Sequence, residues 1–354
     1  MSTPRQRLEA TFDGGPAGEN TVCLHSWGYY PFESVGRGEL YGQCSGEELA
    51  DIYEKFWLSF EFDWIHVLGL PFKEKSAAAI ARGQAAAGRG HTLSAGSAPS
   101  LVPPRTIDDI DRILETRFSF SRERILERGD FEHIRILAER VGDQVMIFPN
   151  QGSPGGNIPG LSFEDHMILI QERPDLVEYF VRESCRRFLT RVRVAKECGA
   201  SGFILSEGYG ASCDMISPAL YERVFLEAKQ EFYSEINRIG LIAVGYFLGD
   251  VMPYLRTIQE MGLGGLMVEE SKKDFHLDPA AIRKELSADV VLFGNLDSVI
   301  LLKGTPGRIR DAVLRQAEAM RYGRFVFING SPICPNTPPE NVRVFVDAAR
   351  RARP

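Results

Sequence analysis

The chain has 354 residues, of which 44% are hydrophobic and 25% are charged, as in an ordinary globular protein. Its formal net charge is −7 and its isoelectric point is about 5.6, which argues against non-specific binding to nucleic acid or to an anionic membrane. The six cysteines form no C-x-x-C pair, and no stretch is apolar over the length of a membrane span or a signal peptide. We therefore expect a cytoplasmic protein with no nucleic acid or membrane partner.

Short apolar runs alternate with longer amphipathic segments along the chain. A helix is predicted over 4–12, and a Gly-rich link ends this N-terminal extension at residue 20. Strands are predicted at 21–27, 64–69, 144–148, 202–206, 241–246, 265–268, 290–293 and 325–328. Helical patterns occupy 46–62, 107–141, 162–198, 217–238, 251–261, 279–286, 306–322 and 338–351. Residues 71–105 are rich in Ala, Gly, Ser and Pro, which predicts a long loop or lid.

The predicted strands are short and almost continuously apolar. This pattern is typical of parallel strands that helices cover on both faces. Eight strand–helix alternations in a chain of this length predict a single-domain (β/α)8 barrel, or TIM barrel, over residues 21–354. A doubly wound open sheet is the alternative. No G-x-G-x-x-G follows the first strand, which argues against the dinucleotide-binding form of that alternative.

Polar residues follow nearly every predicted strand, at the end of a barrel where active sites lie. A carboxylate, imidazole or phenol in a partly desolvated barrel mouth can transfer a proton. The candidate catalytic residues are His66, Glu207, Tyr246 and Asp250. The candidate substrate-binding residues are His25, Trp27, Asn150, Tyr209, Glu269, Asn295 and Ser331. Asn295 also suits a local role, in which its side chain closes a loop by bonding to the backbone.

The loop after the last predicted strand contains both a thiol, Cys334, and a helix-start pattern. Thr337 is predicted to be the N-cap, Pro338 the first helical residue, and Glu340 follows three residues after Thr337. The sequence therefore predicts that this loop enters the last helix directly from the mouth of the barrel.

Three segments of the C-terminal part read Gly-Asn-Leu-Asp at 294–297, Leu-Leu-Lys-Gly-Thr-Pro at 301–306 and Pro-Asn-Thr-Pro-Pro-Glu-Asn-Val at 335–342. Together with residues 198–200 and 216–221, these segments resemble the uroporphyrinogen decarboxylase superfamily. The resemblance covers the chain well from residue 140 onward. It implies a TIM barrel that performs either decarboxylation or zinc-dependent methyl transfer from a corrinoid protein to a thiol. It also implies that a homodimer is common.

The chain departs from both branches of that superfamily. The methyltransferase branch holds zinc with a His-x-Cys triplet and a later Cys, but the corresponding positions here are Tyr246, Leu248 and Ser331. The decarboxylase branch binds four acidic side chains with an arginine-rich segment, and residues 25–33 contain no arginine. Uroporphyrinogen is therefore not the expected substrate.

The residues favour a decarboxylase or lyase that uses acid–base chemistry on an organic acid, with no cofactor and no metal expected. A corrinoid-linked methyltransferase with altered zinc ligation is one alternative, and its replacement ligands would be Cys334, His66 and Glu269. A member that binds a ligand without catalysis is the other alternative. The expected partners are a small organic acid, a corrinoid protein in the first alternative, and a second copy of the chain.

Overall fold

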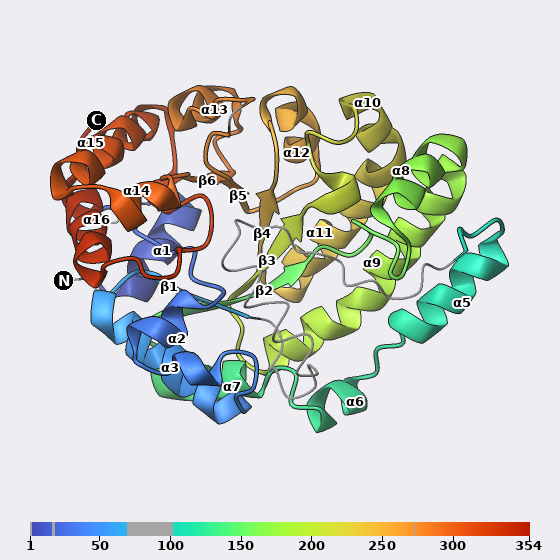
Figure 1. Ribbon diagram of the computed structural model, residues 1–354, viewed down its shortest axis with the longest axis horizontal. Helices are drawn as coiled ribbons and strands as arrows, with labels where there is room; N and C mark the ends of the chain where they lie inside the picture. Colours follow the sequence, from blue (N-terminus) through green and yellow to red (C-terminus); the bar gives the residue numbers. More distant parts are fainter. Residues whose placement is uncertain (1, 16–17, 69–101, 273) are drawn as a thin grey trace.

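The computed structural model describes residues 2–15, 18–68, 102–272 and 274–354, which form a curled parallel sheet surrounded by helices (Figure 1). Within these residues the sheet has seven strands, and each pairs in parallel with the next along the chain. They are β1 (Trp64–Leu68), β2 (Met146–Gly152), β3 (Gly202–Glu207), β4 (Ile242–Phe247), β5 (Gly265–Val268), β6 (Val291–Phe293) and β7 (Phe325–Val326). The order confirms the predicted α/β barrel class. Most of the predicted loop or lid at 71–105 lies outside the described residues.

The first predicted strand, residues 21–27, is not a strand, although it completes the ring. Val22 forms an isolated parallel bridge with Phe327, and the N–H of Cys23 donates to the carbonyl of Phe327 at 2.8 Å. On the other side, the N–H of Asp63 donates to the carbonyl of Val22 at 2.8 Å. The segment therefore stands between β7 and β1, in the eighth position of the barrel.

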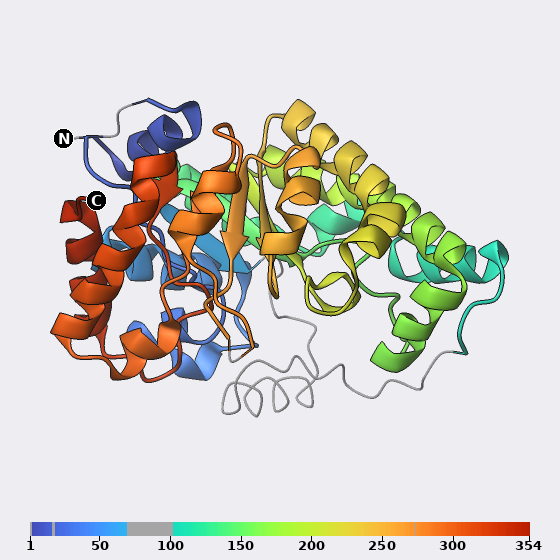
Figure 2. The same cartoon turned by 90° about the horizontal axis from the view of Figure 1, so that it is seen from above.

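Helices surround the strands in both views (Figures 1 and 2). The predicted helix at 107–141 is three separate helices, and the helical pattern at 162–198 forms two helices, the second of which begins at Pro174. A short π-helix at Glu222–Leu226 interrupts the helix predicted at 217–238. No helix in the described part of the chain has the length and apolar character to cross a bilayer. The α-helices are α1 (Pro4–Asp13), α2 (Tyr30–Ser34), α3 (Gly46–Phe60), α5 (Ile107–Arg117), α6 (Arg122–Glu127), α7 (Glu132–Val141), α8 (Phe163–Glu172), α9 (Pro174–Glu197), α10 (Pro218–Tyr221), α11 (Glu227–Ile239), α12 (Leu255–Glu260), α13 (Pro279–Glu285), α14 (Ser298–Lys303), α15 (Pro306–Ala317) and α16 (Pro339–Arg351).

The last helix begins one residue later than predicted. α16 starts at Pro339, and the Thr337 hydroxyl donates to the carbonyl of Cys334 at 2.7 Å instead of accepting from the helix. The prediction of a Thr337 N-cap is therefore wrong, because this hydroxyl closes the preceding turn. Asn341 fixes the start of α16 by donating to the carbonyl of Leu301 at 2.8 Å.

An aromatic layer fills the barrel below its mouth. The rings of Trp64 and Phe148 lie 5.2 Å apart, and those of Trp64 and Phe293 lie 5.0 Å apart and are stacked. Trp64 is on β1 and Phe293 is on β6, and these strands are not neighbours, so their contact crosses the interior. Side chains alternate along a strand, so His66 points to the same side as Trp64. The floor of the mouth is therefore apolar, and His66 lies directly above it.

Asp63 is a buried carboxylate that joins the two ends of the chain, which lie at the same end of the molecule in both views (Figures 1 and 2). Its Oδ1 is 2.8 Å from Nη2 of Arg7, on α1, and accepts from Nη2 of Arg350, on α16, at 2.8 Å. Its Oδ2 accepts from the N–H of Val22 at 2.7 Å. These contacts hold α1, α16 and the closing segment against β1.

Replacing Arg350 by methionine is expected to lower the free energy of unfolding by about 1.5–3 kcal/mol. The substitution keeps much of the apolar stem but removes charge-assisted hydrogen bonds to Asp63, which retains Arg7 as a partner. Urea denaturation followed by circular dichroism measures the change. The neighbouring Arg351 is exposed, so Arg351→Met is the matched control and should stay within about 0.5 kcal/mol of the parent. Equal losses in the two variants would contradict the assignment.

Candidate functional site

Three buried rings from different parts of the chain pack together at the carboxyl ends of the strands. The rings of His25 and His66 are stacked at 5.0 Å, and the ring of His25 meets that of Tyr246 edge-on at 4.8 Å. The indole N–H of Trp27 donates to Nε2 of His25 at 2.8 Å. Because this nitrogen accepts, the His25 ring is uncharged. The structure thus brings four sequence-predicted residues into one group.

His66 has no solvent-exposed surface, and burial lowers its pKa to about 3. A side-chain hydrogen-bonding contact with Asn150 opposes this shift, although neither ring nitrogen of His66 reaches normal hydrogen-bond geometry with any described residue. At neutral pH the ring is therefore a neutral imidazole with one N–H donor and one acceptor nitrogen, and its contact with Asn150 leaves it able to bond to a further group.

Tyr246 is held in its protonated form. Its hydroxyl donates to the carbonyl of Gly330 at 2.9 Å, and burial, reinforced by the charges of Glu269 and Glu270, raises its pKa well above the ordinary value. The phenol therefore ties β4 to the last loop. Its predicted catalytic role stays a prediction.

A charged cluster, defined by Glu269, Glu270, Lys272 and Ser331, lies beside these rings. Nζ of Lys272 is 3.2 Å from Oε2 of Glu269 and 3.1 Å from Oε1 of Glu270. The Ser331 hydroxyl donates to Oε2 of Glu270 at 2.5 Å. Oε1 of Glu269 accepts from the N–H of Gly249 at 2.7 Å. One ammonium thus serves two carboxylates at the end of β5.

Burial shapes the protonation of this cluster. It raises the pKa of Glu269, against the opposing effects of the Gly249 N–H and of Lys272. Burial also disfavours the charge of Lys272, but the two carboxylates outweigh it and raise the Lys272 pKa. Glu269 is therefore a carboxyl group that retains a proton to higher pH than an ordinary glutamate, next to a permanent cation.

Two asparagines position the backbone around the cluster. The Asn295 amide donates to the carbonyl of Glu269 at 3.2 Å and to that of Leu277 at 3.0 Å. The buried Asn329 accepts from the N–H of His25 at 2.9 Å and donates to the carbonyl of Ser331 at 2.6 Å. The contacts of Asn295 are those expected if its side chain closes a loop by bonding to the backbone. Its contact with a substrate stays a prediction.

Glu207 faces away from the mouth. On β3 it pairs in register with Phe247, whereas Ser206 pairs with the inward-facing Tyr246, so alternation sends Glu207 outward. There its Oε1 accepts from Lys229 at 2.9 Å and from Tyr233 at 2.6 Å, and all three side chains are fully buried. The structure separates Glu207 from the other candidates, and its geometry is that of a structural ion pair rather than of an acid–base group.

The other predicted residues are spread around the mouth. Asp250 follows β4, where its Oδ1 accepts from the N–H of Met252 at 3.1 Å. Asn150 accepts from the Ser206 hydroxyl at 3.3 Å inside the barrel. Tyr209 begins a 3₁₀ turn after β3, and its side chain lies outside the described part of the structure.

The residues at the family's zinc positions do not suit zinc in this chain. The Tyr246 hydroxyl donates to a carbonyl, Leu248 has no donor atom, and the Ser331 hydroxyl is bonded to Glu270. No three His, Cys, Asp or Glu side chains of the described residues gather into a metal-binding group, so Cys334, His66 and Glu269 do not form the alternative ligand set. Burial also raises the Cys334 pKa, which disfavours the thiolate.

Sequence reasoning missed two residues of this region, namely Lys272 and Ser206. Lys272 follows two glutamates at a strand end and lies in a Ser-Lys-Lys run, which has the pattern of a solvated surface loop. Its position two residues after the acidic pair was the available signal, because a cation there can pair with both carboxylates. Ser206 faces inward because it pairs in register with Tyr246, and that register is not visible in the sequence.

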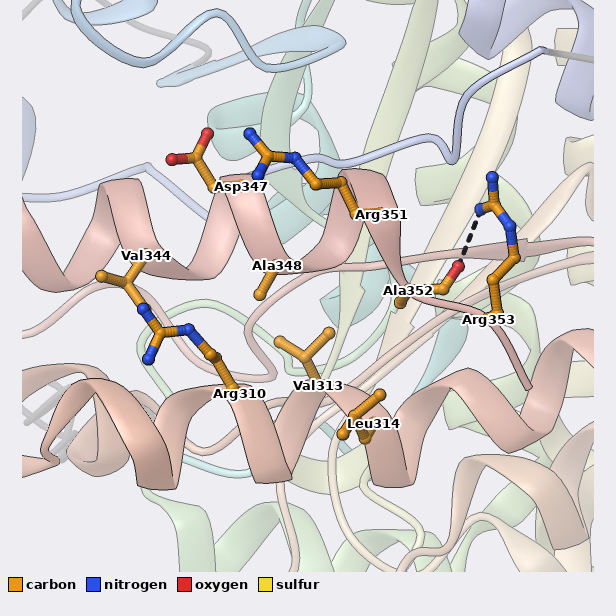
Figure 3. Close-up of a pocket in the computed structure, with 9 residues that line it drawn as sticks. All are labelled: Arg310, Val313, Leu314, Val344, Asp347, Ala348, Arg351, Ala352 and Arg353. Atoms are coloured by element: carbon orange, nitrogen blue, oxygen red, sulfur yellow. Dashed lines mark hydrogen bonds between the residues drawn. The ribbon is translucent and has the colours of Figure 1, made fainter.

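A groove of about 540 Å³ lies between α15 and α16, away from the mouth (Figure 3). Its floor includes Val313 and Ala348, and Arg310, Asp347 and Arg351 stand around it. All these residues belong to the outer helices, and none follows the end of a strand. The groove is therefore separate from the candidate active site.

Residues 78–352 match the family model described as uroporphyrinogen decarboxylase (URO-D). The chain belongs to this family. A methylcobamide:CoM methyltransferase, MtaA, from Methanosarcina barkeri is 28% identical to this URO-D family member over 219 residues, 61% of either chain. A uroporphyrinogen decarboxylase from Rhodospirillum rubrum is 24% identical over 281 residues, 76% of either chain.

One solved structure superposes on this URO-D family member over nearly the whole length of both chains. A methyltransferase from Methanosarcina mazei superposes with a TM-score of 0.75 at 22% sequence identity, covering 99% of this chain and 98% of that one. The likeness supports the barrel. By contrast, the sequence match with MtaA spans 61% of that protein's length.

Proposed function

We propose that this URO-D family member is a carboxy-lyase that removes CO2 from a small organic acid by acid–base chemistry. The observation that carries the proposal is the buried carboxyl of Glu269, whose pKa is raised and whose Oε2 lies 3.2 Å from the ammonium of Lys272. A general acid that holds its proton near a fixed cation suits the protonation of a carbanion.

The chemical step follows from these two groups. Lys272 orients the substrate carboxylate by charge, and Glu270 with Ser331 holds the ammonium in place. The bond from the carboxylate to the adjacent carbon breaks, CO2 leaves, and its electron pair stays on that carbon. Glu269 then delivers its proton to the carbon and is reprotonated from solvent. The cluster contains one lysine and two glutamates, so it offers a single cation. A substrate with one carboxylate therefore suits it better than a polycarboxylate.

Methyl transfer is the second candidate, and the similarity of this chain to MtaA favours that reaction. In that reaction the partner would be a corrinoid protein and the acceptor a thiol, with zinc bound through ligands other than the family positions. The donor set described above argues against this candidate. A homodimer and the absence of a cofactor both stay predictions.

The first test is a panel of monocarboxylic acids, incubated with protein of measured metal content, with released CO2 as the readout. We expect turnover without stoichiometric metal. Lys272→Met should raise KM by about 10-fold or more with a smaller effect on kcat, because it removes a ground-state contact. Lys55→Met, at an exposed site on α3, is the control.

Three outcomes separate the candidates. CO2 release that depends on Lys272 supports the lyase. Methyl transfer from methylcobalamin to a thiol, together with bound zinc and no CO2 release, would replace the lyase by the methyltransferase. Binding of acids without any turnover would indicate a member that binds a ligand without catalysis.

A further inference from the structure

His66 has a feature that the proposed acid–base pair does not use. Its side chain is fully buried inside the barrel, and neither ring nitrogen makes a hydrogen bond of normal geometry within the described residues. Buried polar side-chain atoms nearly always have partners, and an unpaired one costs about 1–3 kcal/mol. An imidazole in this position is therefore explained best by a group that arrives with the ligand.

The position of His66 faces the charged cluster. The strands run in sequence from β1 to β7, and residues 21–25 close the ring between β7 and β1. β1 and β5 are consequently opposite each other, four steps apart in either direction. A ligand that spans the mouth therefore meets His66 at one end and Glu269, which follows β5, at the other.

The wall around His66 is polar but uncharged. Asn150 on β2 lies next to it, and Ser206 on β3 donates to Oδ1 of Asn150 at 3.3 Å. His25, whose ring stacks on His66 at 5.0 Å, is also neutral, because its Nε2 accepts from Trp27. This wall suits a neutral hydrogen-bonding group of the substrate, such as a carbonyl, and not a second carboxylate.

Decarboxylation gives a chemical role to both sides of the mouth, to His66 on one side and to the charged cluster on the other. Loss of CO2 leaves an electron pair on carbon, and a carbonyl one carbon further on takes it up as an enolate. An N–H donor aimed at that oxygen stabilises the negative charge as it develops. A neutral imidazole donates such a bond without transferring its proton, so the proton that reaches carbon comes from Glu269.

We propose that His66 is a catalytic residue that donates a hydrogen bond to the carbonyl oxygen of a β-oxo acid, and that β-oxo monocarboxylates are the substrate class. This inference rests on the proposed decarboxylation. In the balanced step, the bond from the carboxylate to the α-carbon breaks and its electrons form an enolate whose oxygen faces His66. The enolate then collapses as Glu269 protonates the α-carbon, which yields CO2 and a ketone.

The test uses stable sulfonates, which keep the anionic end but do not release CO2. The probes are two matched pairs: 2-oxopropanesulfonate with propanesulfonate, and 2-oxo-2-phenylethanesulfonate with 2-phenylethanesulfonate. Calorimetry on the full chain should give about 5- to 10-fold tighter binding of the oxo member of whichever pair fits, the effect of one buried hydrogen bond. No preference for the oxo member in either pair would overturn the inference.

His66→Phe keeps the stacked ring and removes both nitrogens, so the preference should fall below about 2-fold. His66→Gln restores a donor and should recover part of the preference. As a readout of the unaltered protein, the ¹⁵N resonances of the His66 ring should shift with the oxo member and not with its partner. A preference that survives in His66→Phe would overturn the assignment to His66.

The inference and the proposed function fail in different ways. CO2 release from acids that lack the oxo group, with no preference for the oxo member in binding, would contradict the inference about His66. It would leave the proposed lyase function intact. The opposite outcome is a binding preference for the oxo member that depends on His66, with no CO2 release from acetoacetate or benzoylacetate above their spontaneous rates. That outcome would contradict both the lyase function and the catalytic role of His66. In the supporting result, both acids or the one that fits lose CO2, and His66→Phe lowers kcat by about 10²–10³-fold.

Discussion

Replacing Glu269 by glutamine is expected to lower kcat for the proposed decarboxylation by about 10²–10⁴-fold, the usual contribution of a general acid. Glutamine keeps the shape and still accepts from the N–H of Gly249, but it has no proton to deliver to carbon. Substrate binding should change far less, since Lys272 remains. Steady-state CO2 release at saturating substrate measures kcat, and thermal unfolding confirms that the variant is folded.

The pH profile gives a sharper form of the same prediction. Burial raises the pKa of Glu269, so the protonated, active form persists above the ordinary value of 4.5. Activity should be full below the raised pKa and should fall as pH rises through it. Glu269→Gln should lose this limb. Asp250→Asn is the matched control, because Asp250 follows the neighbouring strand and accepts from the N–H of Met252. Loss of activity and of the limb in Asp250→Asn alone would move the acid to Asp250.

Replacing Glu207 by glutamine is expected to lower the free energy of unfolding by about 3–5 kcal/mol, because it leaves the ammonium of Lys229 buried without a carboxylate. Lys229 also donates to the carbonyl of Pro154 at 2.9 Å, so the loop after β2 should loosen as well. Urea denaturation at neutral pH measures the loss. The kcat per folded molecule should change little, because Glu207 lies on the helix side of β3.

A double substitution separates structure from catalysis at this position. Glu207→Leu with Lys229→Met removes both charges together, and such exchanges of buried pairs are often neutral or stabilising. We expect the double variant to recover most of the stability that Glu207→Gln loses, and to remain active. A Glu207→Gln protein that is as stable as the parent but inactive would restore Glu207 as a catalytic residue and remove the structural interpretation.

Local sequence patterns were sufficient for the barrel and the family. Continuous apolar runs predicted β1 to β7, because strands covered on both faces need apolar residues throughout. The segments at 294–297 and 335–342 carried the family resemblance, and the match over 78–352 confirms it. Residues 21–27 show the limit of this reasoning. Their composition is that of a strand, but only the bridge at Val22 forms between β7 and β1.

The candidate site was determined in part by the sequence and in part by the tertiary structure. The sequence placed His25, His66, Tyr246 and Glu269 around the mouth. The fold packs the first three rings together and places Glu269 close enough for its charge to act on Tyr246. The sequence could not determine which face of β3 points inward, because one step along a strand reverses a side chain. The sequence therefore did not reveal that Glu207 points away from the barrel interior and forms an ion pair there.

Lys272 illustrates the same limit for charge. By sequence it belongs to a basic surface run, and only the folded chain places its ammonium between Glu269 and Glu270. Likewise, His66 is one imidazole among six in the sequence, and only the folded chain buries it inside the barrel beside Asn150 and His25. The sequence alone determined which barrel this chain forms. Its charges, donors and acceptors acquired partners only through tertiary packing, because register and burial depend on residues far apart in the chain.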